Sequence, residues 1–107
     1  MITGGNSGIG LETCKAFASA GAKVILCSRS VQAGEKAVDD EVKAPGHGGY
    51  SVQEPNIIVK QLDLARFDSV KALTDDIIAT EPRIDFLIFN AGKSFSLLFF
   101  TPFESFV

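Results

Sequence analysis

A glycine-rich segment near the start of the chain is the first stretch whose residue types could do chemistry. Residues 3–10 read Thr-Gly-Gly-Asn-Ser-Gly-Ile-Gly and precede an amphipathic stretch over residues 11–20. Glycine lacks a side chain, so the backbone can turn sharply here and approach a ligand closely. The amide groups and positive dipole end of a following helix would then face that ligand, which suits a phosphate. The segment predicts a cradle for a dinucleotide pyrophosphate, and an ordinary strand-to-helix turn is the alternative. The expected binding residues are Gly4, Asn6, Ser7, Gly8, Ile9 and Gly10.

The pattern of the remaining chain predicts the elements that must position this turn. Helices are expected over about residues 7–20, 31–43 and 68–81, and strands over residues 23–28, 57–62 and 84–89, with a Gly- and Pro-rich loop over 44–56. Ser30 is a suitable N-cap for the second helix, and Gly21 a C-terminal cap for the first. Strands that alternate with helices indicate right-handed crossovers and a parallel sheet. We therefore expect an α/β fold.

Helical spacing of apolar residues predicts the buried face of each helix. The expected sets are Ile9, Cys14, Phe17 and Ala18 in the first helix, Val31, Gly34, Val38 and Val42 in the second, and Val70, Leu73, Ile77 and Ile78 in the third. The apolar run Phe86–Phe89 is expected to form the core of the last strand. The almost continuous apolar run over residues 23–28 favours a strand buried on both faces of a parallel sheet.

A basic residue follows the second expected strand. Ligands of open parallel sheets bind beyond the carboxyl ends of the strands. Arg29 lies 19 residues after Gly10, close to the spacing of about 20 at which dinucleotide-binding units place the residue that reads the ribose. An acid there would bind the 2′-hydroxyl of NAD, whereas arginine favours the 2′-phosphate of NADP. The alternative is a solvated side chain at the end of a strand.

The third and fourth expected strands end in small or polar residues. Asp63 could accept a hydrogen bond from the adenine amine, or could instead supply negative charge to the start of the third helix. Asn90, Ala91 and Gly92 would let a cofactor pass close to the backbone, and Asn90 could tie neighbouring strands together. A plain turn is the alternative for these three residues.

Taken together, the motifs resemble those of the short-chain dehydrogenase/reductase family. Residues 3–10 resemble its cofactor motif, Asp63-Leu64 its adenine-side motif, and Asn90-Ala91-Gly92 its fourth-strand motif, in the same order. This resemblance implies a partial Rossmann-type doubly wound parallel sheet with strand order 3-2-1-4 and a truncated first strand. It also adds Leu64 to the expected cofactor-binding residues.

The amino-acid sequences of three segments are most similar to those of one subgroup of that family. The segments are Gly8–Thr13, Ile25–Arg29 and Gln61–Ala65. The subgroup includes retinol dehydrogenases, the WW-domain oxidoreductase and protochlorophyllide reductases, which generally use NADP. The resemblance therefore implies NADP as the cofactor, with NAD as the alternative, and hydride transfer to or from a carbonyl or alcohol as the reaction.

The chain departs from the family pattern at its catalytic group. The family uses a Tyr followed four residues later by a Lys, whose charge lowers the pKa of the Tyr. Here the single tyrosine is Tyr50, and the residue four positions later is Glu54 rather than Lys. In addition, Phe89 replaces the first Asn of the family's Asn-Asn-Ala-Gly. No catalytic residue can be carried over. We expect residues 1–92 to form the N-terminal part of a dinucleotide-binding domain, inactive in hydride transfer as this chain, and leave the Phe-rich tail 93–107 unassigned. A non-catalytic nucleotide-binding or interaction module is the alternative, and a small-molecule substrate is expected only for a longer parent enzyme.

Composition limits the class of protein, its partners and its location. The chain has 107 residues, of which 46% are hydrophobic and 21% charged, and this balance indicates a globular domain. A net charge of −3 with no basic patch argues against a nucleic-acid partner. The two cysteines lack metal-site spacing, so no metal is expected and both are expected to be free buried thiols. No apolar run approaches the roughly 18 residues of a membrane span, and the first residues do not resemble a signal peptide. The default expectation is a cytoplasmic protein, unless a native targeting segment is missing from its start.

Overall fold

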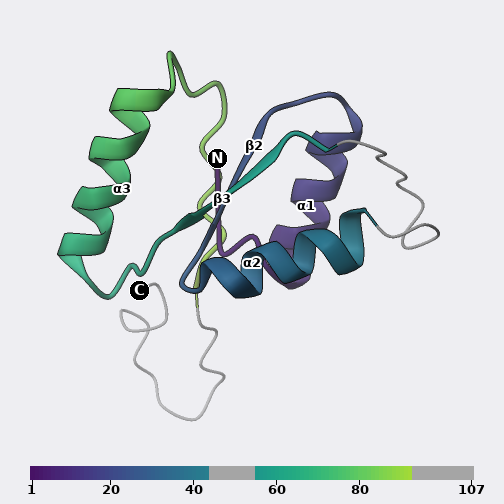
Figure 1. Cartoon of the computed structure of the whole chain (residues 1–107), viewed down its shortest axis with the longest axis horizontal. Coiled ribbons are helices and arrows are strands. Elements are labelled where there is room, and N and C mark those ends of the chain that lie inside the picture. Colours follow the sequence, from purple (N-terminus) through teal and green to yellow (C-terminus); the bar gives the residue numbers. More distant parts are fainter. Residues whose placement is uncertain (44–54, 93–107) are drawn as a thin grey trace, which may run out of the picture.

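The computed structural model describes residues 1–43 and 55–92 (Figure 1). Its elements, in order, are β1 (Ile2–Thr3), α1 (Gly8–Ser19), β2 (Val24–Ser28), α2 (Val31–Ala37), η1 (Val38–Val42), β3 (Ile57–Gln61) and α3 (Phe67–Thr80). The expected alternation of strands and helices is confirmed. The expectations for Tyr50, for most of the loop 44–56 and for the tail 93–107 lie outside the described residues.

The three strands form a parallel sheet in the order β1-β2-β3. Ile2 pairs with Leu26, and the whole of β2 pairs with β3, from Val24 opposite Ile57 to Ser28 opposite Gln61. The fourth strand expected over residues 84–89 is not formed. A single parallel bridge joins Ile88 to Ile2, at the position a fourth strand would take beside β1. The reason is the length of β1, because two residues offer too little backbone to hold a longer partner.

The core has two layers, one on each face of the sheet. In Figure 1, α3 lies on one side of the strands, and α1 and α2 lie on the other. Successive side chains of a strand point to opposite faces. Accordingly Val24 and Leu26 pack with residues of α1 and η1, while Ile25 and Cys27 pack with Leu73 of α3. The continuous apolar run of β2 is thus buried on both faces, as expected.

Both expected helix caps are present. The Ser30 hydroxyl accepts a hydrogen bond from the Ala33 amide at 3.2 Å. At the end of α1, Gly21 has a φ of +88°, and the amides of Gly21 and Ala22 donate to the carbonyls of Ala18 and Phe17 at 3.0 Å each. This is the paired bonding of a Schellman motif, which requires a left-handed residue and therefore favours glycine.

The second helix differs from its expected form, because it changes to a π-helical turn, η1, after Ala37. The Lys43 amide donates to the carbonyl of Val38, five residues earlier, at 3.1 Å. Val38 and Val42 are both buried there, as their spacing predicts, and so is Gly34 in α2.

Five apolar residues expected in the core, Ile9, Ile78, Phe86, Leu87 and Phe89, are exposed instead. Ile9 and Ile78 are 80% and 75% exposed, because they lie off the buried faces of their helices. In α1 that face follows Leu11, Cys14 and Ala18, and Ile9 is about 200° from Leu11 at the helical rotation of roughly 100° per residue. Phe86 and Phe89 are 64% and 80% exposed, since the short pairing at Ile88 does not fix residues 84–89 as a covered strand.

Candidate nucleotide-binding site

A cavity of about 410 Å³ lies at the carboxyl ends of the strands. Its lining residues come from the four segments that the sequence singled out: Gly4, Asn6, Ser7, Ser28, Arg29, Leu62, Asp63, Leu64, Ala65, Asn90, Ala91 and Gly92. The fold thus brings together residues almost ninety positions apart. Gly8, Ile9 and Gly10, which were also expected at the site, do not line this cavity.

The glycine turn is shaped by close packing and by its backbone conformation. Gly4 and Gly8 have φ values of +62° and +55°, a region that side chains disfavour. A Cβ on Gly10 would clash with the Gly4 carbonyl oxygen and the Asn90 side-chain nitrogen, whereas the space beside Gly8 is open. Gly10 therefore allows α1 to approach the turn, whereas the requirement at Gly8 is its backbone conformation.

The N-terminus of α1 lies beside this turn and carries no side-chain cap. Its N-cap residue is Ser7, whose hydroxyl makes no capping bond, and its first turn holds no acidic residue. By contrast, the Ser30 hydroxyl caps α2. The first amides of a helix lack partners within the helix, so an uncapped start is suited to an anion. Within the described part of the chain, this end of α1 meets the requirement for a phosphate cradle.

A cluster of hydrogen bonds ties the fourth segment to the glycine turn. The Asn90 side chain donates to the Gly4 carbonyl at 3.1 Å. The buried Thr3 hydroxyl accepts from the amides of Asn90 and Ala91 at 3.0 Å each. The suggestion that Asn90 ties neighbouring segments together fits this geometry. Thr3, the other half of the link, was not singled out from the sequence, because only the fold shows its contact with residues 90 and 91.

Arg29 and Asp63 lie at adjacent strand ends, on the side of the cavity away from Asn90. The Arg29 side chain is exposed and makes no ion pair with any residue in 1–43 or 55–92. Its carbonyl accepts from the Gln61 side chain at 3.4 Å. The Asp63 carboxylate accepts from the Ala65 amide at 3.1 Å, which holds the turn after β3. The acidic residue in the first turn of α3 is Asp68, not Asp63.

Three residues that line the cavity were not predicted as site residues from the sequence. Ser28, Leu62 and Ala65 each adjoin an expected site residue, so their place at the strand ends was the available signal. Ser28 is buried, and its hydroxyl accepts from the Ser30 amide at 3.4 Å. These three residues shape the wall of the cavity rather than adding new chemical groups to it.

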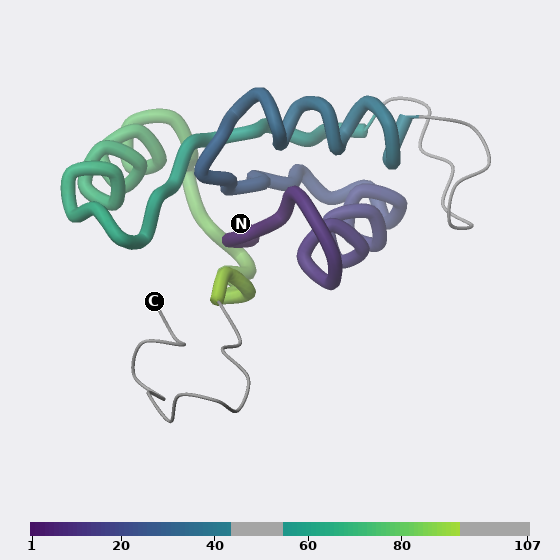
Figure 2. The backbone as a smooth tube through the Cα atoms, turned by 90° about the horizontal axis from the view of Figure 1, so that it is seen from below, coloured from purple at the N-terminus to yellow at the C-terminus, as the bar shows by residue number. Residues whose placement is uncertain are grey.

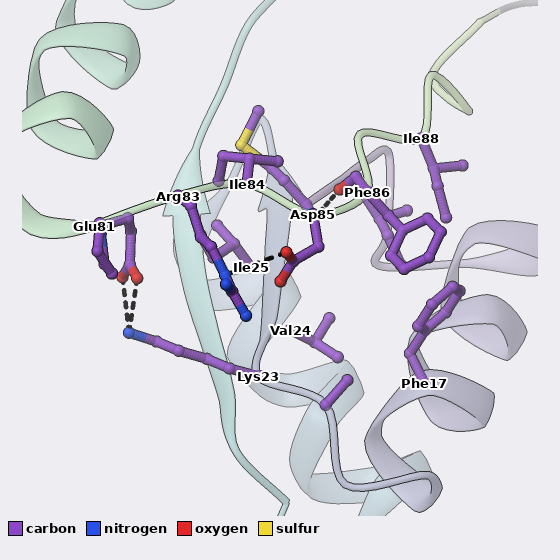
Figure 3. A pocket seen from close by; sticks show the side chains of 14 residues that line it. Phe17, Lys23, Val24, Ile25, Glu81, Arg83, Ile84, Asp85, Phe86 and Ile88 are labelled. Atoms are coloured by element: carbon purple, nitrogen blue, oxygen red, sulfur yellow. Dashed lines mark hydrogen bonds and ion pairs between the residues drawn. The ribbon is translucent and has the colours of Figure 1, made fainter.

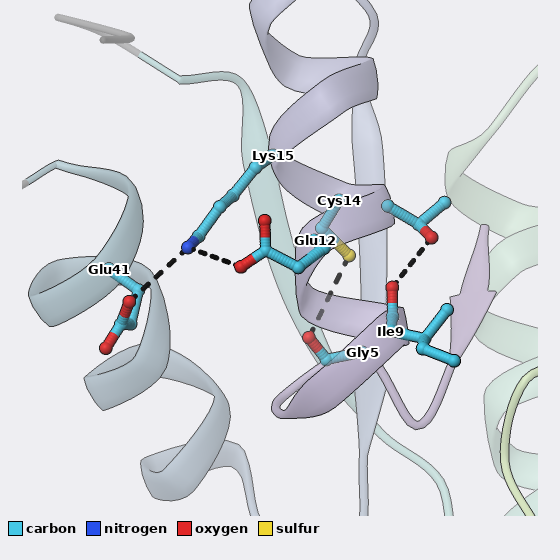
Figure 4. A network of polar contacts seen from close by, with 7 residues as sticks. Gly5, Ile9, Glu12, Cys14, Lys15 and Glu41 are labelled. Carbon is cyan, nitrogen blue, oxygen red and sulfur yellow. Dashed lines mark hydrogen bonds and ion pairs between the residues drawn. The ribbon is translucent and has the colours of Figure 1, made fainter. Parts of the chain in front are cut away.

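Behind the glycine turn, a buried lysine joins α1 to η1 (Figure 4). The Lys15 side chain is 3% exposed, and its ammonium lies 2.9 Å from a Glu12 oxygen and 3.3 Å from a Glu41 oxygen. The hydrogen bond to Glu12 is the main cause that raises the pKa of Lys15, so the charge is retained despite burial. This network supports the helix that begins at the cradle.

Both cysteines are free and buried, as expected. Burial raises the pKa of Cys14 to about 12 and that of Cys27 to about 11. Thiolate is the reactive form, so neither thiol is suited to nucleophilic chemistry at neutral pH. Among the described residues, no group of His, Cys, Asp and Glu side chains is arranged to hold a metal ion.

Comparison with known proteins defines the family to which this fold and cavity belong. The family model for short chain dehydrogenases matches residues 1–105. The chain is 40% identical over 94 residues to human dehydrogenase/reductase SDR family member 13, and 38% identical over 95 residues to mouse retinol dehydrogenase 14. Those alignments cover 88% and 86% of this chain, but only 23% and 28% of the two relatives.

Solved structures agree with that result. Menthone neomenthol reductase from Mentha piperita matches with a TM-score of 0.64 and 38% identity, over 85% of this chain and 30% of that protein. A putative betaketoacyl-ACP reductase matches with a TM-score of 0.64 and 33% identity, over 98% of this chain and 39% of that protein. The chain belongs to the short-chain dehydrogenase family and has its Rossmann-type fold. It spans about a quarter of the length of the two relatives.

No helix within residues 1–43 and 55–92 has the length and apolar character needed to cross a membrane.

Proposed function

We propose that the cavity at the strand ends binds NADP(H). The observation that carries this proposal is the convergence of the glycine turn, Arg29 and Asp63 on one cavity. The uncapped start of α1 would hold the pyrophosphate, since its amides and dipole favour an anion. Arg29 would bind the 2′-phosphate, and the second Asp63 oxygen would accept from the adenine amine.

The fourth segment would complete the site on the nicotinamide side. Ala91 and Gly92 are small residues, and the bond from Asn90 to the Gly4 carbonyl keeps them beside the glycine turn. When bound, the nicotinamide would supply or accept a hydride, as in oxidoreductases of this family. The residues of this chain would hold and orient the cofactor.

We further propose that the 107-residue chain binds the cofactor without catalysing hydride transfer. Proton transfer to or from the substrate oxygen needs a positioned acid or base. The family's Tyr and Lys have no counterpart, because Tyr50 is the only tyrosine and Glu54 stands where the Lys would follow. The activity of the family would then belong to a longer form that carries those residues.

Calorimetric titration of the pure chain with NADPH and NADH tests the cofactor. We expect NADPH to bind more tightly, and Arg29→Ala to weaken NADPH binding by roughly 10- to 150-fold, the equivalent of a charge-assisted bond of about 1.5–3 kcal/mol. NADH binding should not change. Arg83→Ala is the matched control, because Arg83 is exposed and pairs with Asp85 away from the cavity. Equal affinities for the two cofactors, or no effect of Arg29→Ala, would contradict the NADP assignment.

The proposed lack of hydride-transfer activity needs a separate assay. We expect no oxidation of NADPH by the pure chain with a panel of aldehydes and ketones. Oxidation that disappears in Gly8→Asp, which places a negative charge at the start of α1, would show that this part of the proposal is wrong.

A further inference from the structure

The turn between β3 and α3 holds three of the four polar groups of Asp63. Figure 2 shows the chain passing from β3 through this short turn into α3. The Asp63 carbonyl accepts from the Arg66 amide at 3.1 Å, and its Oδ1 accepts from the Ala65 amide at 3.1 Å. The Asp63 amide donates to the Ser69 hydroxyl at 2.8 Å. The remaining group, Oδ2, makes no hydrogen bond or ion pair with a described residue.

The bond from Asp63 to Ser69 joins the end of the sheet to a helix. The Leu62 amide donates to the Ser28 carbonyl at 2.9 Å, so by alternation the Asp63 amide points away from β2. Because β3 is the edge of the described sheet, no described strand lies on that side to accept from this amide. Ser69, in the first turn of α3, supplies the acceptor instead. The hydroxyl therefore fixes the backbone of Asp63 relative to α3.

Neighbouring charges leave the second oxygen of Asp63 available. The cation in the same turn is Arg66, whose guanidinium holds the two oxygens of Asp68 at 3.1 and 2.6 Å. At the other end of the sheet, Lys23 holds both oxygens of Glu81 in the same way, at 2.7 and 2.9 Å (Figure 3). The Asp63 carboxylate has no such cation among the described residues. It can therefore accept a further hydrogen bond at the nucleotide cavity that it lines.

We propose that Ser69 is a positioning residue for the adenine end of the cofactor and acts through Asp63. This inference rests on the proposed NADP(H) site. Ser69 holds the amide of Asp63 and the turn holds Oδ1, so Oδ2 is kept in place to accept from the adenine amine. Asp63 lines both the nucleotide cavity and a cavity of about 330 Å³ beside α3, whereas Ser69 lines only the latter. Its effect on binding therefore passes through Asp63 rather than through contact with the cofactor.

Replacement of the adenine amine tests this role directly. Calorimetry of the full chain compares NADPH with reduced nicotinamide hypoxanthine dinucleotide phosphate, in which an oxygen replaces the amine. We expect the parent chain to prefer NADPH at least about tenfold, because a carboxylate accepts from the amine but repels the oxygen. In Ser69→Ala this preference should fall at least about threefold, since hydrogen bonds weaken steeply when their alignment is lost. A general loss of structure would instead weaken both nucleotides alike and leave their ratio unchanged.

Two further variants separate positioning from stability. Ser69→Thr keeps the hydroxyl and should retain the preference of the parent chain. Thr74→Ala removes a hydroxyl from the same helix, where it donates to the Val70 carbonyl at 2.8 Å, and should leave the preference unchanged. Circular dichroism checks that all three variants remain folded. Hydrogen exchange at the Asp63 amide should be faster in Ser69→Ala and unchanged in the other two variants.

The outcomes that would overturn this inference differ from those that would overturn the proposed function. If Ser69→Ala keeps the full preference for NADPH, or if a folded Ser69→Thr loses it, Ser69 does not position Asp63, and the cofactor site still stands. If the parent chain binds NADPH and its hypoxanthine analogue equally, Asp63 does not contact the adenine amine, although the chain binds the cofactor. If the parent chain binds neither nucleotide, the proposed function fails together with this inference.

Discussion

The side-chain amide of Asn90 lies 3.1 Å from the carbonyl oxygen of Gly4, and this hydrogen bond joins residues 86 positions apart. It connects the segment after Ile88 to the turn before α1. The segment is also held by the bridge at Ile88 and by the bonds from the amides of Asn90 and Ala91 to the Thr3 hydroxyl. The geometry of the candidate site therefore depends on a contact that no local pattern specifies.

Replacing Asn90 should loosen the nucleotide site. In Asn90→Ala the Gly4 carbonyl loses its partner, and we expect a loss of about 1 kcal/mol in unfolding free energy together with weaker NADPH binding. Urea unfolding and calorimetry measure the two effects. Asn56→Ala is the control, because Asn56 is exposed and, within residues 1–43 and 55–92, only its backbone carbonyl makes a hydrogen bond. Equal effects of the two substitutions would mean that the bond to Gly4 has no special role.

The glycines at positions 8 and 10 should respond differently to alanine. In a helix, Gly→Ala ordinarily stabilises by about 0.5–1 kcal/mol. At Gly10 the added Cβ would clash with Gly4 and Asn90, so we expect net destabilisation and loss of NADPH binding. At Gly8 the space is open, and the cost is backbone strain at a φ of +55°, about 1–3 kcal/mol.

The comparison of the two alanine variants distinguishes packing from strain. Gly10→Ala should alter the exchange rates of amides near Asn90, while Gly8→Ala should alter only those at the start of α1. If Gly10→Ala is as stable as the parent and binds NADPH normally, then α1 does not pack against the turn as the structure shows.

The carboxylates around Lys15 should contribute more to the free energy of unfolding than the carboxylates of exposed ion pairs. In the double variant Glu12→Gln, Glu41→Gln, a buried ammonium keeps only neutral partners, and we expect a loss of about 1–2 kcal/mol. Asp40→Asn is the control, since its partner Lys36 is exposed and such pairs contribute about 0–1 kcal/mol. Urea unfolding at low and high salt measures both. A loss no larger than that of the control would show that Lys15 does not need charged partners.

The two thiols should make the fold sensitive to alkaline pH. Burial raises the pKa of Cys14 to about 12 and that of Cys27 to about 11, above their ordinary value of 9.0. The folded state therefore favours the neutral thiols. Their contribution to the free energy of unfolding is complete below pH 9 and is lost between about pH 9 and 12. Comparing unfolding free energies over this pH range with those of the double variant Cys14→Ala, Cys27→Ala isolates the contribution of the two thiols. At pH 8 iodoacetamide should label both thiols in urea and neither in the folded chain. Rapid labelling of the folded chain would contradict their burial.

Local patterns in the sequence determined the type and order of most elements. The apolar run of β2, the cap at Ser30 and the glycine at position 21 each act within a few residues, so their structural consequences can be predicted from the sequence. The spacing of the glycine turn, Arg29, Asp63 and Asn90 along the chain likewise predicted residues that meet at one end of the sheet. This succeeds because the carboxyl ends of parallel strands share one edge.

Tertiary structure decided strand pairing and helix burial, because both depend on which other part of the chain a surface contacts. Residues 84–89 have the composition of a strand, yet they form only the bridge at Ile88, because a strand needs a neighbour of matching length and β1 has two residues. Ile9 and Lys15 show the same dependence: the apolar residue is exposed and the charged one is buried. Burial follows from the face on which a helix packs, and pairing follows from the strand alongside. Both are set by contacts between distant parts of the chain, whereas propensity and spacing are properties of neighbours in sequence.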